Sequence, residues 1–306
     1  MGPSGRNRSA ALAVVLFFLV MGGLFFASVK MLSGGKGSSP AKVTAFSRDK
    51  VAVVRLGGVI IDSREVNRQL DKWSEDNSVR AIVLKINSPG GVVAPSQEIH
   101  SAVRRAMAKK PVVASMGALA ASGGYYAAAP CSKIVANPGT ITGSIGVIIM
   151  FSSTHELMKK IGLGATVVKS GKFKDVGSPH RPFTSEDQEL IQGVVDDTYE
   201  QFVEDVAAGR KMPVDEVRKL ADGRIYTGRQ AHKVKLVDQI GDFEDALALA
   251  ARLGGIEGKP ETVEDEKDKG LLRRLMGDGM DEDYDSAISF NRLFPPPGLY
   301  FLWPAF

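Results

Sequence analysis

The feature that most constrains this chain is the stretch 111–129, which has the pattern of a strand, a turn of small residues and a helix. Ser122 stands at the turn, directly before Gly123 and Gly124. A strand that turns into a helix leaves the first helical N–H groups unpaired, and together with the helix dipole they stabilise an anion. A serine there suits an acyl-transfer nucleophile. It also suits a simple N-cap, so this stretch alone leaves both interpretations open.

The residues around this stretch alternate between strand and helix patterns. Strands are predicted over 50–56, 79–86 and 112–115, with helices over 63–77 and 96–109. This alternation indicates an α/β fold with a parallel sheet and crossover helices. Asn87–Gly91 and Ala121–Gly124 both follow strands, at the edge where such sheets bind ligands. We therefore expect these two segments to be neighbours.

The second half of the chain continues the pattern. Further strands are predicted over 133–136, 140–147 and 166–169, and helices over 155–161, 184–209, from 213 and over 243–253. The long helix begins with a capping pattern, Thr184-Ser-Glu-Asp187. The last residues, 299–306, include four aromatic side chains. Such an end is expected to dock, with its own subunit, the membrane and the substrate groove as alternatives.

The N-terminus indicates a membrane anchor. Residues 10–29 carry no charge, and as a helix they would span about 30 Å, the thickness of a bilayer core. No A-x-A cleavage pattern follows, which favours an uncleaved anchor. The predicted organisation is a tail (1–9), a transmembrane anchor (10–29), a linker (30–47), a catalytic domain (48–255) and a charged tail with an apolar end (256–306).

The amino-acid composition limits which ligands and which catalytic groups the chain can use. A net charge of +4 without a long basic run gives no indication of nucleic-acid binding. The single cysteine, Cys131, and four scattered histidines form no metal-site pattern. No histidine carries a motif that would mark it as the base for Ser122. A lysine can act as a base when burial lowers its pKa, and Lys169, Lys172 and Lys174 are the candidates.

Five motifs in a fixed order are informative together: Asn87-Ser-Pro-Gly-Gly91, Met116-Gly-Ala-Leu-Ala-Ala-Ser-Gly-Gly-Tyr-Tyr126, Thr142-Gly-Ser-Ile-Gly146, Lys169-Ser-Gly-Lys-Phe-Lys-Asp175 and Asp222-Gly-Arg-Ile-Tyr-Thr-Gly-Arg229. Over about residues 48–253 the chain resembles the signal peptide peptidase A family in its short, single-repeat form. The resemblance implies a Clp protease/crotonase-like fold and a Ser/Lys dyad. It makes Ser122 the nucleophile, Lys174 the general base, Ser144 the group that orients the lysine, and Gly91 and Gly123 the oxyanion donors.

The resemblance also implies a setting. The enzyme would be anchored in the bacterial inner membrane by one helix, with a cytoplasmic N-terminus and an extracytoplasmic catalytic domain. It would degrade remnant signal peptides without a cofactor or metal. It would form a ring, an octamer by resemblance, in which neighbouring subunits supply the serine and the lysine of one site.

Three alternatives share parts of this pattern. A crotonase-type acyl-CoA enzyme would share the fold and the oxyanion hole. A related Ser/Lys membrane protease would act on a membrane-protein partner, and a non-enzymatic membrane scaffold would keep a relic active site. The intact Ser122, Lys174 and Ser144 argue against the scaffold.

Overall fold

The computed structural model describes residues 49–265 and 300–302. The predicted anchor over 10–29, the linker over 30–47 and most of the C-terminal tail lie outside the described residues. Among the helices of the described part, none is long and apolar enough to cross a membrane. The account below concerns the unit that begins at Arg48.

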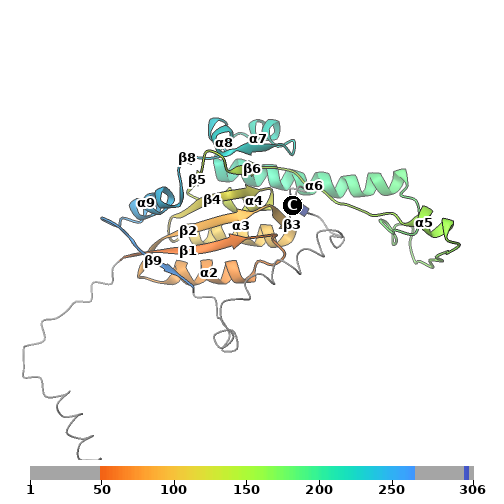
Figure 1. Cartoon of the computed structure of the whole chain (residues 1–306), viewed down its shortest axis with the longest axis horizontal. Helices are drawn as coiled ribbons and strands as arrows, with labels where there is room; N and C mark the ends of the chain where they lie inside the picture. The colour runs from red at the N-terminus through yellow and green to blue at the C-terminus, as the bar shows by residue number, and fades with distance from the viewer. Residues whose placement is uncertain (1–48, 266–299, 303–306) are drawn as a thin grey trace, which may run out of the picture. The chain divides into compact units, whose positions relative to one another are not determined.

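An eight-stranded sheet forms the centre of this unit (Figure 1). Its main path runs in the order β7-β6-β4-β2-β1-β9, and β5 pairs with both β4 and β8. The strands are β1 (Lys50–Gly57), β2 (Val79–Ser88), β4 (Val112–Ala121), β5 (Lys133–Ala136), β6 (Ile141–Gly143), β7 (Ile225–Thr227), β8 (Gln239–Ile240) and β9 (Glu261–Glu264).

The sheet is mixed, which corrects the prediction of a parallel sheet. All pairs are parallel except β6 with β7, which is antiparallel. The residues before β7 lie against the residues after β6: Gly223 N donates to Ile145 O and Ser144 N donates to Arg224 O. Because the chain enters β7 at the end where β6 finishes, β7 has to run in the opposite direction.

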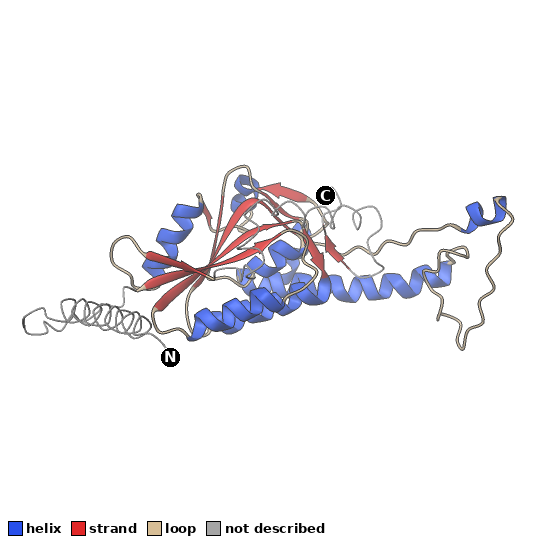
Figure 2. Ribbon diagram, turned by 60° about the horizontal axis from the view of Figure 1, so that its bottom comes forward, coloured by secondary structure: helices blue, strands red, loops and turns tan. Residues whose placement is uncertain are grey.

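Helices cover both faces of the sheet (Figure 2). Residues of α2 (Arg64–Glu75), α3 (Val93–Met107), α4 (Gly123–Ala128) and α6 (Ser185–Arg210) share one buried cluster with Ala52 and Val54 of β1. The alternate β1 residues, Val51 and Val53, join α9 (Phe243–Leu253) in a second cluster. Successive strand residues point to opposite faces, so one strand supplies both cores. Each fully buried valine stabilises the fold by about 1.5–3 kcal/mol.

The predicted helix α6 is present with its capping box. The Thr184 side chain accepts from Asp187 N, and the Asp187 carboxylate accepts from Thr184 N. The helix ends at Arg210, and its C-cap residue, Lys211, has a left-handed backbone with a φ of 55°. Two short helices follow it, α7 (Val214–Leu220) and α8 (Gly228–Lys233).

Residues 149–184, here called the arm, differ most from expectation. The arm contains α5 (His155–Lys160) and otherwise loops, and it lies at the far end of α6 from the sheet (Figure 1). The predicted strand over 166–169 is absent. Val167 and Val168 are 51% and 95% exposed, because this apolar segment has no neighbouring strand in the described chain with which to pair.

The short strands over 90–92, 225–227 and 239–240 were not predicted, and neither were two strands beyond residue 255. β9 extends the sheet beyond residue 255 although Glu261-Thr-Val-Glu264 contains one large apolar residue. β10 (Tyr300–Leu302) pairs antiparallel with β3 (Gly90–Val92) in a second, two-stranded sheet. The described part of the apolar C-terminal end is thus docked on the chain's own catalytic unit.

Candidate active site

Ser122 occupies a strained elbow between β4 and α4. Its backbone has φ 52° and ψ −116°, a conformation that non-glycine residues rarely adopt and that is retained mainly where it serves a site. Both neighbours hold the elbow in place: Ser122 N donates to Gly143 O, and Tyr126 N donates to Ser122 O, each at 2.8 Å. The strain is therefore supported by the sheet on one side and by the helix on the other.

The Ser122 side chain does not cap α4. It makes no capping hydrogen bond, and its Oγ is buried without any hydrogen-bond partner among the described residues. Leaving a buried hydroxyl unpaired costs about 1–3 kcal/mol. Of the two interpretations that the sequence left open, the N-cap is therefore wrong, and the hydroxyl is left available for chemistry.

The two glycine turns meet beside Ser122, which confirms their predicted proximity. A Cβ built on Gly123 would lie 3.2 Å from Gly90 Cα. A Cβ on Gly90, where φ is +97°, would lie 2.0 Å from the Phe301 carbonyl oxygen and 2.6 Å from Gly123 N. The Phe301 carbonyl and the Gly123 N–H thus share the space above Gly90, which stays open because glycine has no side chain.

The backbone of Gly91 faces the same carbonyl. Gly91 is the register partner of Phe301 in the β3–β10 ladder. Both backbone groups of Tyr300 are bonded to Ile148, with N···O distances of 3.1 Å. Since backbone groups alternate in direction along a strand, those of Phe301 point toward Gly91. The N–H groups of Gly91 and Gly123 are therefore arranged around one carbonyl oxygen next to Ser122.

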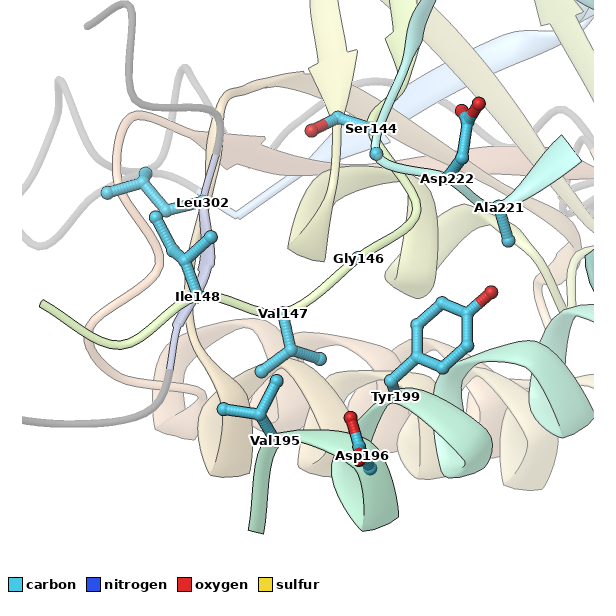
Figure 3. Close-up of a pocket in the computed structure, with 11 residues that line it drawn as sticks. Ser144, Gly146, Val147, Ile148, Val195, Asp196, Tyr199, Ala221, Asp222 and Leu302 are labelled. Carbon is cyan, nitrogen blue, oxygen red and sulfur yellow. The ribbon is translucent and has the colours of Figure 1, made fainter. Parts of the chain in front are cut away.

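Ser144 follows β6 as Ser122 follows β4. The two strands are parallel, with Ala121 opposite Gly143, so the two serines leave the sheet side by side. Ser144 also has a left-handed backbone, with φ 50°. Its side chain faces a cavity of about 420 Å³ (Figure 3). The other residues that line it are Gly146, Val147, Ile148, Val195, Asp196, Tyr199, Ala221, Asp222, Gly223 and Leu302.

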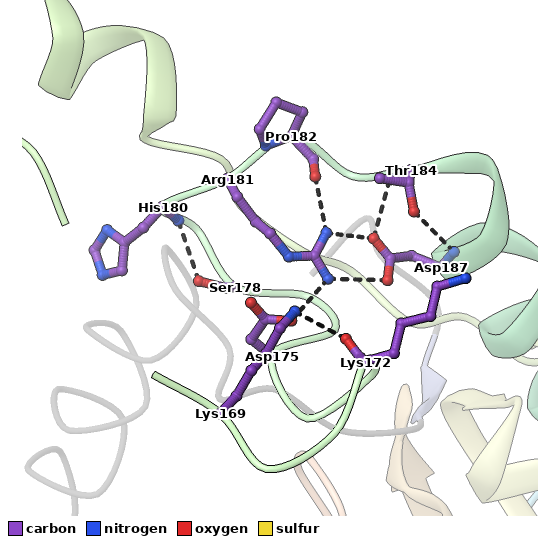
Figure 4. A network of polar contacts seen from close by, with 9 residues as sticks. All are labelled: Lys169, Lys172, Asp175, Ser178, His180, Arg181, Pro182, Thr184 and Asp187. Carbon is purple, nitrogen blue, oxygen red and sulfur yellow. Dashed lines mark hydrogen bonds and ion pairs between the residues drawn. The ribbon is translucent and has the colours of Figure 1, made fainter. Parts of the chain in front are cut away.

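The three candidate lysines all lie on the arm, and their amines differ. Lys169 Nζ donates to Asp175 at 2.6 Å and to the Lys172 carbonyl at 2.8 Å (Figure 4). Lys172 Nζ pairs with Glu186 at 2.5 Å. Lys174 is exposed, and its amine has no ion pair or hydrogen bond with any described residue. Of the three amines, that of Lys174 is the one without an ion pair or a hydrogen bond to a described residue.

The structure does not bring any of these lysines to Ser122 within one chain, since Ser122 Oγ has no partner among the described residues. The histidines do not replace them. His155 and His232 bond to the carbonyls of His180 and Val237, and the buried His100 Nε2 has no partner either. Ser122, Ser144 and the two predicted oxyanion donors, Gly91 and Gly123, lie together, and no described lysine or histidine is hydrogen-bonded to Ser122 Oγ.

Comparison with known proteins decides the family. The profile of peptidase family S49 matches residues 104–257, and that of Clp protease matches residues 50–140. Two relatives have names that begin with "Putative". One is a protease of Synechocystis sp., which is 43% identical over 76% of this chain and 84% of the relative. The other is the signal peptide peptidase SppA of Enterococcus faecium, which is 42% identical over 66% of this chain and 62% of the relative. The chloroplastic serine protease SPPA of Arabidopsis thaliana is 33% identical over 68% of this chain and 33% of the relative.

The chain belongs to peptidase family S49. It is a serine protease with a Clp protease-like α/β fold, as the order of its motifs predicted. One part of this peptidase's site was not predicted from the sequence, and another was predicted only as one of three alternatives. Gly90 contributes through its positive φ and its contact with Phe301, and the strand over 300–302 lies in the site itself. For the aromatic end the sequence left its own subunit, the membrane and the substrate groove open, and the Gly90-Gly91 pair was the signal for Gly90.

Proposed function

We propose that this S49 peptidase is a membrane-anchored endopeptidase that degrades remnant signal peptides with Ser122 as nucleophile and Lys174 as general base. The observation that carries the proposal is the elbow at Ser122, with its strained backbone and its buried, unpartnered Oγ. A hydroxyl held in this way next to glycine N–H groups matches the requirements of acyl transfer.

In the proposed reaction, the neutral Lys174 amine takes the proton of Ser122 Oγ as that oxygen attacks the substrate carbonyl carbon. The carbonyl oxygen becomes an oxyanion, which accepts hydrogen bonds from the N–H groups of Gly91 and Gly123. The lysine then protonates the leaving amine, and an acyl-enzyme forms. A water molecule, deprotonated by the same amine, attacks the ester carbonyl carbon, and the amine returns that proton to Ser122 Oγ as the ester bond breaks and the carboxylic acid leaves. Ser144 holds the ammonium group in line with Ser122.

We propose further that Lys174 comes from a second copy of the chain in a ring. Support comes from the arm. Within residues 49–265 and 300–302, no base is hydrogen-bonded to Ser122 Oγ, and Lys174, whose amine has no partner in this range, lies on an exposed segment. Ten of the fourteen exposed large apolar side chains among the described residues lie within residues 150–194. Large exposed apolar surfaces are typical of protein interfaces. The cavity beside Ser144 offers the room through which a neighbour's lysine would reach Ser122.

The membrane setting rests on the sequence of residues 10–29 and on the name of the Enterococcus relative. We propose that the N-terminus is cytoplasmic and the catalytic unit extracytoplasmic, where signal peptides that remain in the bilayer are in reach. An exchange of residues 10–29 for a polar linker is then expected to release the protein from carbonate-washed membranes.

A fluorophosphonate probe tests the reaction class, because it labels an activated serine and leaves a crotonase-type acid/base site unlabelled. We expect the full-length protein to be labelled at Ser122 and to cleave an apolar signal-peptide sequence faster than a polar peptide of equal length. Ser122→Ala is expected to abolish both signals, and Ser101→Ala, at an exposed serine of α3, to abolish neither. Labelling at another serine would contradict the assignment.

A further inference from the structure

The three residues of β10 lie as an extended peptide between two backbone edges. On one side they pair antiparallel with β3: Tyr300 with Val92, Phe301 with Gly91 and Leu302 with Gly90. On the other side Tyr300 exchanges both of its backbone hydrogen bonds with Ile148, each at 3.1 Å. A peptide held as an added strand gains affinity from its main chain, and alternate side chains decide specificity.

The residue at the centre of this peptide is Phe301. Its carbonyl oxygen lies over Gly90, in the space that it shares with Gly123 N beside Ser122. The next side chain, that of Leu302, lines the cavity that also contains Ser144 (Figure 3). Phe301 therefore holds the position of the residue whose carbonyl is attacked, and Leu302 that of the residue after the scissile bond.

The Phe301 side chain fills an aromatic pocket between three helices, and it is fully buried. Its ring stacks on Tyr126 of α4, with centroids 4.9 Å apart and an interplanar angle of 26°. It also contacts Phe202 of α6, with centroids 4.6 Å apart. Aromatic pairs in this range of geometry are attractive beyond the burial of area. Tyr126 and Phe202 are in turn edge-to-face at 4.8 Å.

Polar groups fix the walls of this pocket. Tyr126 OH donates to the Asp205 carboxylate of α6, which ties the ring to that helix. The His100 ring of α3 packs against Tyr126 at a tilt, with ring centroids 4.9 Å apart. Gln97 of α3 and Gln201 of α6 are joined at 2.8 Å. The pocket is thus shaped by contacts that do not involve its occupant, as a preformed binding site requires.

We infer that this pocket, formed by Tyr126 and Phe202, selects a peptide with an aromatic side chain immediately before the scissile bond. The chain's own Phe301 is its resident competitor. The inference rests on the proposed function, because it takes the carbonyl over Gly90 to be the one that Ser122 attacks. It deepens that proposal by naming the side chain that the enzyme recognises.

The test uses the full chain and two internally quenched peptides that differ at one position, Phe or Ala before the scissile bond. We expect kcat/KM to favour the Phe peptide by about tenfold or more, since a pocket discriminates by roughly 10–200-fold per missing methylene. Phe301→Ala is expected to raise kcat/KM for the Phe peptide severalfold, mainly through a lower KM. Phe202→Ala is expected to reduce the preference for Phe.

Phe243→Ala is the matched control, because Phe243 packs in the cluster on the other face of the sheet. It is expected to change neither the preference nor KM. Equal cleavage of both peptides by the wild-type chain would overturn the inference even if a variant fails to fold. That result, with Ser122 still labelled by the fluorophosphonate, would leave the proposed function standing. Absence of both labelling and cleavage would count against the proposed function itself.

Discussion

The elbow and the arm of this peptidase are built in opposite ways. The elbow at Ser122 is 1% exposed and is held by the sheet, by α4 and by two glycine turns. The arm carries Lys174, and its polar contacts include those of Arg181 with Asp175 in the arm and with Asp187 at the start of α6 (Figure 4). The elbow is ordered by the folded unit, whereas Lys174, the proposed base, lies exposed on the arm. The difference supports the proposal that one chain folds around the serine and that a second copy supplies the base.

The largest expected effect concerns the elbow. Ser122→Ala is expected to lower kcat by about 10³-fold or more, since removal of a nucleophile leaves only the residual catalysis of binding and oxyanion contacts. Thermal unfolding is expected to be unchanged or slightly shifted upward, because the lost hydroxyl has no hydrogen-bond partner among the described residues. A substantial residual rate would mean that Ser122 is not the nucleophile.

The next effect concerns the arm. Lys174→Ala is expected to lower kcat by about 10²–10⁴-fold, the usual range for a general base. Lys172→Ala is the matched control, since that amine already pairs with Glu186 and its exposed ion pair is worth little. The wild-type rate is expected to rise with pH, because an amine accepts a proton only in its neutral form. The reverse pattern, with Lys172→Ala inactive and Lys174→Ala active, would move the base to Lys172.

A smaller effect is expected where the two regions meet. Ser144→Ala is expected to lower kcat by about 10–100-fold with little change in KM, because a misplaced base costs rate rather than binding. The fluorophosphonate reaction is expected to slow in proportion. Asp222→Asn, at another residue of the same cavity, serves as the control. Equal losses in both variants would mean that the cavity acts as a whole and that Ser144 has no special role.

The smallest expected effect is a difference in local stability between the arm and the sheet at low pH. The Arg181 side chain lowers the pKa of Asp175 and of Asp187 below their usual values. A carboxylate whose pKa is lowered by folding contributes stability above its unfolded pKa, and that stability is lost as the pH falls through the folded value. Hydrogen exchange in the arm is therefore expected to increase below about pH 4, ahead of exchange in the sheet. Arg181→Ala is expected to do the same at neutral pH. Simultaneous loosening of arm and sheet would show that the network does not stabilise the arm separately.

The sequence predicted the elbow better than the arm for a physical reason. Apolar runs such as 79–86 and the small residues around Ser122 specify local structure that tertiary packing then confirms. Val167 and Val168 have the same apolar pattern, yet they form no strand, because nothing in the described chain pairs with them. The direction of β7 and the docking of β10 depend on where distant segments return, which local patterns do not encode.

The most direct test of a shared site is to mix two inactive chains, Ser122→Ala and Lys174→Ala, under conditions in which subunits exchange. If neighbours in a ring supply the two groups, about one quarter of the sites in an equal mixture contain an intact serine and an intact lysine. Activity is then expected to return to about that fraction of the wild-type value. Mixed rings, verified by differently tagged subunits, that stay inactive would contradict a base supplied by the neighbouring copy.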